Sequence, residues 1–474
     1  MEVPPLLRLL ILLYLFNLTG SPFLAVVDAR QQCRLQAPQD QAEFASPNDP
    51  FPSPGSNGTN NGTSSNGTTT NPAITPFAYG TDKIRGVNLG GWFVLEPWIT
   101  PSIFENTGND DIIDEFTFGQ HLNSSYAQQV LQQHWNTWIT EDDFKAIRAA
   151  GLNHVRIPLG YWSVPMDDNE SVSPYIAGAW PYFLRALNWA KSNSLNVIVD
   201  LHGAPGSQNG YDNSGQRTNN PVWATGDGNV NRTIEILSFI AEKAGGMIDV
   251  LELLNEAAGF ISSEWATTIR QFWQDGYNAV RQAAGSGMKI MIGDAFLTVQ
   301  NWENFLTYPS SQGVMMDIHE YQIFSVEELQ RSNDEHIDFA CSLIPGLADY
   351  DQNDLWTIVG EWSTASTDCA QWLNGRGIGS RWDGTYPGSG TPTLGSCAGL
   401  TGNSANFSSD FKSYLRKYWE VQVDIGESVS GWIYWTWKTE SADEWSYQKG
   451  LEGGWIPQDP TERLYPGLCN NTSG

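Results

Sequence analysis

The sequence is poor in basic residues. Its 474 residues include 25 lysines and arginines against 53 aspartates and glutamates, which gives a formal net charge of −28. A nucleic-acid partner is bound through basic side chains that neutralise phosphates. The composition therefore excludes nucleic acid as an expected partner and favours a soluble protein that works in mildly acidic surroundings.

Cysteine is also scarce, with five residues in the whole sequence. None shows the short paired spacing of a zinc site. We therefore predict no metal, and we predict no cofactor either. Cys33 stands alone, whereas Cys341, Cys369, Cys397 and Cys469 lie in the C-terminal third. In an exported protein, four clustered cysteines predict two disulfides, whose pairing the spacing leaves open.

The N-terminal apolar run is too short and too interrupted for a membrane span, which needs about 20 mostly apolar residues. Arg8 precedes the apolar residues 9–16, small residues follow, and Ala29 is a plausible cleavage point. This pattern predicts a signal peptide over residues 1–29, in preference to a signal that stays in the membrane as an anchor. We therefore expect the protein to be secreted, to the extracellular space or the cell wall.

Residues 30–80 are predicted to form a disordered, glycosylated spacer, because a stretch rich in Ser, Thr, Asn, Gly and Pro buries little apolar surface. Glycosylation sequons occur at Asn57, Asn61 and Asn66. A plain spacer remains the alternative. Further sequons lie at Asn123, Asn169, Asn231, Asn406, Asn470 and Asn471.

The remainder, residues 81–474, is predicted to be one α/β domain. Short β-rich runs alternate with segments whose apolar residues recur every three or four positions, as in helices. One such segment begins at Thr140, with Asp143 three residues on, and ends at Gly151. Strand and helix in alternation predict a (β/α)8 TIM barrel with elaborated βα loops. The eight runs are 83–89, 154–159, 196–202, 249–256, 289–295, 314–321, 357–362 and 431–437.

Two of these runs end in carboxylates, Glu256 in LELLNEAA and Glu361 in IVGEWST. Barrels of this class keep their chemistry at the carboxyl ends of the strands. Cleavage of a glycosidic bond generally requires two carboxyl groups that face one cleft. Either glutamate alone could be a solvated strand end, but several other runs also end in polar or aromatic residues. This shared position predicts an active site.

The motifs GVNLGGWFVLEPW, VRIPLGYW, DLHGAPGSQNGYDNSG, LLNEAA, GEWST and WIYWTWKTE resemble those of the secreted fungal exo-β-1,3-glucanases of glycoside hydrolase family five. The resemblance runs from about residue 80 to Cys469. It implies that Glu256 is the acid/base and Glu361 the nucleophile. It also implies substrate-binding roles for Glu96, Arg156, His202, Tyr211, Asn255, His319, Tyr321, Phe324 and Trp435.

Three positions depart from the pattern of that family. Tyr211 stands where phenylalanine is common, Ala257 follows the acid where proline is common, and Glu320 lies between His319 and Tyr321. We expect Tyr211 to alter acceptor preference and Ala257 to loosen its turn. Because neighbouring residues on a strand face opposite ways, we expect Glu320 outside the site.

Retaining hydrolysis needs an ionised nucleophile and a protonated acid. We expect Arg156 to lower the pKa of Glu361, and burial together with the charge of Glu361 to raise the pKa of Glu256. We also expect Asn255 to bind the 2-hydroxyl of the sugar. Strand alternation over 431–437 would direct Trp435 and Trp437 to one side of the strand. That Trp435 is the one that reaches the sugar is implied by the resemblance alone.

The sequence thus predicts a retaining enzyme that releases glucose from the non-reducing ends of β-1,3-glucan, and we expect it to be a monomer. Exo action requires loops that close one end of the cleft, for which 98–135 and 203–225 are the candidates. Two alternatives stay open. One is β-1,6-glucan cleavage or transglycosylation on the same scaffold, and the other is a non-catalytic protein that binds cell-wall glucan.

Overall fold

The computed structural model describes residues 77–166, 172–388 and 392–470. The predicted signal peptide and most of the predicted spacer lie outside the described residues, as do the sequons within them and the one at Asn169. Residues 77–80, assigned above to the spacer, are described. The rings of Phe77 and Tyr79 lie 4.8 Å apart, and both contact the ring of His154. Packing against the barrel therefore begins before residue 81.

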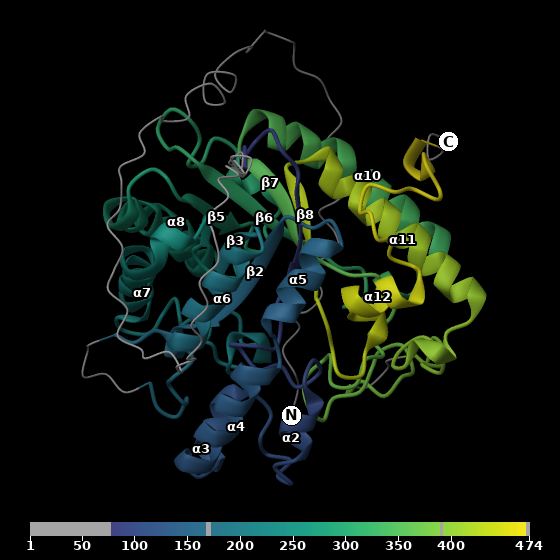
Figure 1. Ribbon diagram of the computed structural model, residues 1–474, viewed down its shortest axis with the longest axis horizontal. Helices are drawn as coiled ribbons and strands as arrows, with labels where there is room; N and C mark the ends of the chain where they lie inside the picture. Colours follow the sequence, from purple (N-terminus) through teal and green to yellow (C-terminus); the bar gives the residue numbers. More distant parts are fainter. Residues whose placement is uncertain (1–76, 167–171, 389–391, 471–474) are drawn as a thin grey trace, which may run out of the picture. The chain divides into compact units, whose positions relative to one another are not determined.

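Eight parallel strands close into a barrel in the order β1 to β8, which confirms the predicted fold (Figure 1). Their residues are mostly apolar and buried on both faces, as expected of a parallel sheet covered by helices. The strands are β1 Ile84–Asn88, β2 His154–Gly160, β3 Asn196–Gly203, β4 Val250–Glu252, β5 Lys289–Gly293, β6 Val314–Glu320, β7 Trp356–Trp362 and β8 Gly431–Tyr434.

The helices pack around the barrel and at its carboxyl end. As predicted, Thr140 and Asp143 form a capping box at the start of α5, and Gly151 follows its end with φ of 79°. The connection from β5 to β6 carries a short 3-10 turn, Val299–Trp302, in place of an α-helix. The helices are α2 Pro101–Glu105, α3 Glu115–His121, α4 Ser124–Thr137, α5 Glu141–Ala149, α6 Trp180–Ser192, α7 Asn229–Ala244, α8 Ser263–Ala284, α9 Val326–Leu329, α10 Asn333–Asn353, α11 Ser409–Ser428 and α12 Tyr447–Gly453.

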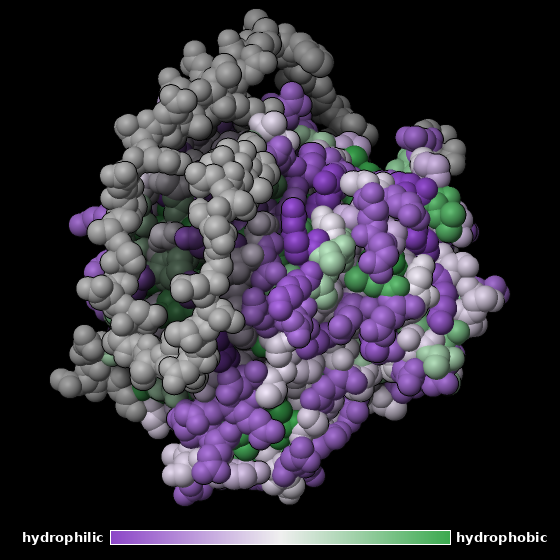
Figure 2. Space-filling view, in the orientation of Figure 1, coloured by the Kyte–Doolittle hydropathy of each residue, from purple (hydrophilic) through white to green (hydrophobic). Residues whose placement is uncertain are grey.

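Apolar side chains fill two regions. A small cluster inside the barrel includes Ile84, Ile198, Met291 and Ile433. A larger one lies between the strands and the surrounding helices. The described surface drawn in Figure 2 is mostly hydrophilic, with only scattered hydrophobic residues. Within the described ranges, no helix combines the length and apolar character that crossing a bilayer requires.

Two disulfides are present among the described residues, as predicted. Cys341 of α10 pairs with Cys469 near the C-terminus, across 128 residues of sequence. Cys369 pairs with Cys397 within the long segment between β7 and α11. The first joins the end of the chain to the helical layer, and the second closes a loop that follows the strand bearing Glu361.

Two of the strands end well before the predicted residues 256 and 437. β4 ends at Glu252 and β8 at Tyr434, so the residues that follow them do not keep strand alternation. The expectation that Trp435 and Trp437 face the same side is wrong for this reason. Trp435 stacks on His202 with ring centroids 5.6 Å apart, whereas the indole Nε1 of Trp437 donates to Asp143 of α5 at 2.9 Å. Trp437 is therefore a structural residue.

Candidate active site

The two glutamates singled out by the sequence lie together at the carboxyl end of the barrel. Glu361 is part of β7, and Glu256 follows β4 in a turn where its own φ is 45°. One carboxylate oxygen of each and a ring nitrogen of His319 from β6 all lie within 4.8 Å of one another. Three strands thus bring two carboxylates and an imidazole to one point.

Arg156 of β2 is fully buried and organises the base of this site. Its Nη1 donates to Glu361 Oε1 at 2.8 Å and its Nη2 to Asn255 Oδ1 at 2.8 Å. Its Nε donates to Glu252 Oε2 at 2.8 Å, and its Nη2 lies 3.0 Å from Asp200 Oδ2. The planar guanidinium therefore fixes four groups from β3, β7 and β4 with the turn after it, which the point charge of a lysine could not do.

His319 lies between the two glutamates. Its Nδ1 is 2.9 Å from Glu256 Oε1 and 3.5 Å from Glu361 Oε2, and its Nε2 is 3.4 Å from Asp317 Oδ2. Burial opposes protonation of this imidazole, but the charges of Glu361 and Asp317, with hydrogen bonds to Asp317 and Glu256, raise its pKa well above the ordinary value. These contacts favour the cationic form of His319, whose Nδ1 lies within hydrogen-bond distance of Glu256.

The expected directions of the two glutamate pKa values are reversed. Burial favours the protonated form of Glu256, but the hydrogen bond and charge of His319 and the hydrogen bond from Asn213 outweigh it and lower the pKa. Burial raises the pKa of Glu361 and exceeds the opposing charges of His319 and Arg156. The sequence did not reveal that His319 would lie against Glu256, which is the physical reason for the error.

Several buried polar atoms at the site have no hydrogen-bond partner among the described residues, and Asn255 Nδ2 and His202 Nε2 are two of them. The orientation of each group is fixed by its other polar atom, because Asn255 Oδ1 accepts from Arg156 and His202 Nδ1 lies 2.5 Å from Asp200 Oδ2. Buried polar groups are normally paired. These atoms are therefore available for the hydroxyl groups of a sugar.

Glu96 and Tyr321 complete the buried part of the site. Glu96 follows β1, is 5% exposed, and accepts a hydrogen bond from Trp98 Nε1 at 3.0 Å. Burial, with the nearby charge of Asp212, raises its pKa well above the ordinary value. The Tyr321 hydroxyl donates to Glu361 Oε2 at 3.1 Å. Together with Trp435, these side chains combine carboxyl, hydroxyl and aromatic surfaces, as sugar binding requires.

Tyr211 and Phe324 have exposed rings, at 48% and 42%. Phe324 lies edge-on to Tyr321 with ring centroids 5.6 Å apart. Tyr211 is close enough to Glu256 for that charge, after burial, to contribute to the raised pKa of its hydroxyl. The residues implied by the sequence are therefore a buried polar set with two exposed aromatic rings beside it.

Glu320 lies outside this set. Its carboxylate interacts with Gln322, Glu328 and Arg331, in agreement with the expectation that it faces away from the site.

The side chains at the site could also hold a cation in principle. Glu256, His319 and Glu361 form one group of close ligand atoms, and Glu252, Asp317 and His319 form a second. Arg156, however, already compensates Glu252 and Glu361 at 2.8 Å. A metal ion would have to compete with that fixed positive charge, so the donor set does not favour one.

Comparison with known proteins agrees with this geometry. The cellulase model of glycosyl hydrolase family 5 matches residues 118–375, more than half of the chain. A glucan 1,3-beta-glucosidase of Blumeria graminis is 44% identical over 402 residues, covering 84% of this chain and 92% of that protein. One of Schwanniomyces occidentalis is 45% identical over 401 residues, covering 82% and 91%.

The chain belongs to glycosyl hydrolase family 5. It is therefore a glycoside hydrolase, as the sequence predicted. The fold extends beyond close relatives. The crystal structure of rutinosidase from Aspergillus niger superposes with a TM-score of 0.63 at 18% identity, covering 81% of this chain and all of that one.

Sequence reasoning missed several residues of this family 5 site. Asn213 donates to Glu256 Oε2 at 2.6 Å, although it lies 43 positions away in the predicted cleft loop. Buried Gln208 donates through Nε2 to the carbonyls of His202 and Asn255 at 2.7 and 3.0 Å. Both belong to DLHGAPGSQNGYDNSG, a motif that was quoted but used only for His202 and Tyr211. Nothing local indicates which of its polar residues point inward.

Proposed function

We propose that this family 5 hydrolase is a secreted retaining exo-β-1,3-glucosidase that releases glucose from the non-reducing ends of β-1,3-glucan. The observation that carries the mechanism is the proximity of Glu256 and Glu361, because one carboxylate oxygen of each lies within 4.8 Å of the other. Inverting enzymes hold the two carboxyl groups about 6.5–9.5 Å apart to admit a water, and retaining enzymes only about 5–5.5 Å. The substrate follows from the glucan 1,3-beta-glucosidase names of relatives at 41–45% identity.

In the first step Glu361 attacks the anomeric carbon and Glu256 protonates the leaving oxygen. Arg156 and Tyr321 hold the two oxygens of Glu361, so the nucleophile is fixed before the sugar arrives. Glu256 receives its proton through the bond to His319 Nδ1. Once Glu361 is esterified, its charge no longer acts on the imidazole of His319. Glu256 then acts as the base that deprotonates the attacking water.

Asn255 stabilises the transition state in this scheme. Arg156 turns its amide so that the unpaired Nδ2 faces the sugar, where a bond to the 2-hydroxyl strengthens as positive charge develops on the ring. His202 offers Nε2 to another hydroxyl, and the stacked indole of Trp435 supports the sugar ring. Glu96, with its raised pKa, can both donate and accept a hydrogen bond.

A second activity, transfer of the glucosyl group to another sugar, is favoured by the exposed rings of Tyr211 and Phe324. Rings of this kind at a cleft mouth can retain an acceptor by stacking while Glu361 carries the glucosyl group. Hydrolysis and transfer then differ only in whether water or a sugar hydroxyl reaches the intermediate. The ratio of the two is expected to change when Tyr211 is replaced by Phe.

The decisive experiment follows the first product by proton NMR with laminarin as substrate. We expect β-glucose to appear first and to mutarotate afterwards, and initial release of α-glucose would refute the mechanism. Pustulan in a parallel reaction tests the β-1,6 alternative. The variant Glu361→Gln should bind laminari-oligosaccharides without turnover, and Glu256→Ala should lose far more activity on glucan than on aryl glucosides with good leaving groups.

A further inference from the structure

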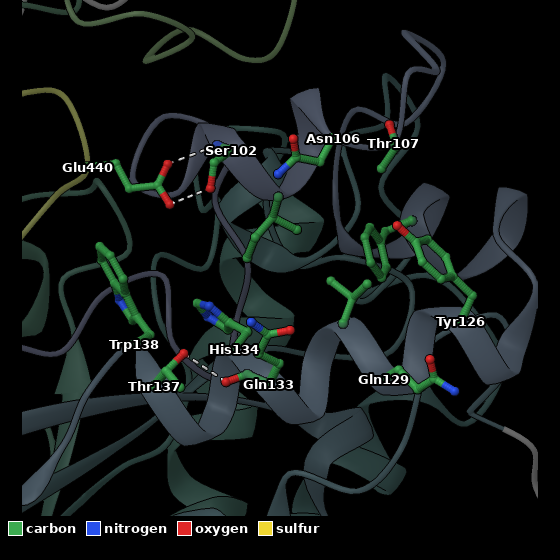
Figure 3. Close-up of a pocket in the computed structure, with 13 residues that line it drawn as sticks. Ser102, Asn106, Thr107, Tyr126, Gln129, Gln133, His134, Thr137, Trp138 and Glu440 are labelled. Carbon is green, nitrogen blue, oxygen red and sulfur yellow. Dashed lines mark hydrogen bonds between the residues drawn. The ribbon is translucent and has the colours of Figure 1, made fainter.

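A second pocket, separate from the paired glutamates, lies between α2 and α4 (Figure 3). Its volume is about 550 Å³, within the range of sites that hold small molecules. Ser102 and Asn106 contribute from α2, and Tyr126, Gln129 and Gln133 from α4. None of the functions assigned above uses this pocket.

The lining of the pocket suits an uncharged, hydroxyl-rich ligand. The Tyr126 ring is 47% exposed. The side-chain amides of Asn106, Gln129 and Gln133 make no hydrogen bond to the described part of the chain, so both their donors and acceptors are free. The lining contains no lysine or arginine, and its one carboxylate, Glu440, is engaged by the backbone and hydroxyl of Ser102 at 2.9 and 2.6 Å. An aromatic face with free amides is the chemistry that recognises carbohydrate.

The residues that α4 contributes form a stripe along one face of the helix, because they recur at intervals of three and four. Tyr126, Val130, Gln133 and Thr137 all belong to it. Asn123, the N-cap of α4, precedes Tyr126 by three residues and so stands about one turn, roughly 5 Å, before the start of the stripe.

Asn123 is exposed and begins the sequon Asn-Ser-Ser. Its Oδ1 accepts hydrogen bonds from the backbone amides of Ser125 and Tyr126 at 3.0 and 3.4 Å, whereas its Nδ2 makes none within the described chain. A glycan attached to Nδ2 leaves Oδ1 in place as an acceptor. The modification is therefore compatible with the cap that starts α4.

We propose that Asn123 carries an N-linked glycan whose first sugars lie in the pocket between α2 and α4. They stack on the Tyr126 ring and bind the amides of Gln129 and Gln133. This inference rests on the export that belongs to the proposed function. Attachment joins Nδ2 to the anomeric carbon of a lipid-pyrophosphate-linked oligosaccharide, the lipid pyrophosphate leaves, and the amide nitrogen gives up one proton.

The chain's own glycan is a better occupant than free glucan for a physical reason. A tethered ligand acts at an effective concentration in the millimolar range, so a shallow site with few contacts is still filled. Asn231 and Asn406 are also exposed sequon residues, but neither lies on the α4 stripe. Asn406, whose side chain makes no hydrogen bond within the described ranges, provides a matched control.

The test uses the full-length protein secreted from a eukaryotic host that adds N-glycans. Peptide mass spectrometry gives the occupancy of Asn123 and Asn406. Ser125→Ala removes the first sequon but keeps the Asn123 cap, and Asn406→Gln removes the control sequon. We expect Asn123 to be occupied, Ser125→Ala to lower the thermal midpoint by several degrees, and Asn406→Gln to leave it unchanged.

A second measurement follows the rate at which an endoglycosidase releases each glycan from the folded protein. We expect Tyr126→Ala to speed release at Asn123 several-fold and to leave the rate at Asn406 unchanged. An unmodified Asn123, or equal release rates in wild type and Tyr126→Ala, overturns the proposal. Laminarin hydrolysis by the same preparations tests the catalytic proposal separately.

Discussion

Replacing Arg156 by Met removes the guanidinium that compensates several buried carboxylates at the base of the site. The guanidinium is fully buried and touches Glu252 and Glu361 at 2.8 Å and Asp200 at 3.0 Å. Breaking a buried ion pair by removing one partner costs about 3–5 kcal/mol, because the other charge stays buried without compensation. Since several carboxylates share this arginine, we expect a loss at the upper end of that range at neutral pH.

The pH dependence of that loss follows from the sign of the pKa change. Without Arg156, burial raises the pKa of Glu252 and Glu361 further, so the folded variant takes up protons that the unfolded chain releases. Groups of this kind stabilise the folded state below their unfolded pKa and lose that contribution as pH rises. The difference in stability between wild type and Arg156→Met should therefore shrink on going from pH 7 to pH 5.

Urea unfolding at both pH values, followed by tryptophan fluorescence, measures this difference. Arg156→Lys is the control, because it keeps the charge but loses the fork that orients Asn255 and Glu361. We expect Lys to recover much of the stability and little of the kcat/KM on laminarin. A free energy of unfolding for Arg156→Met within about 1 kcal/mol of wild type at pH 7 would contradict the reasoning, given the 3–5 kcal/mol cited for such pairs.

Three further predictions test separate features. Replacing Cys341 and Cys469 together by Ser opens a 128-residue loop and should destabilise the protein by about 5 kcal/mol in urea titrations, with activity at 25 °C retained; an unchanged midpoint would show that the link constrains little. Burial raises the pKa of Glu320 from 4.5 to about 8, so wild type should lose stability as pH rises through that window. Glu320→Gln should lose less between pH 5 and 8, with laminarin hydrolysis unaffected. Asn213→Ala removes a donor to the Glu256 carboxylate, so the alkaline limb of the kcat/KM profile should move to higher pH; a shift to lower pH would refute this role.

The sequence by itself determined the barrel and its catalytic end. Each strand is a short apolar run, and the start of α5 depends on Thr140 and Asp143, which are only three residues apart. Local sequence patterns are therefore enough to predict these features. Glu256 and Glu361 could be placed on one face because parallel strands in a barrel all present their carboxyl ends to the same side. That inference needed no knowledge of the loops.

The tertiary structure alone decided how these residues interact. The contact of His319 with Glu256, the bond from Asn213 and the pairing of the four C-terminal cysteines join positions tens to more than a hundred residues apart. Their existence depends on the paths of long loops, which periodicity does not encode. The pKa directions depended on these contacts as well, because a buried carboxylate responds to every charge and donor around it and not to its neighbours in sequence.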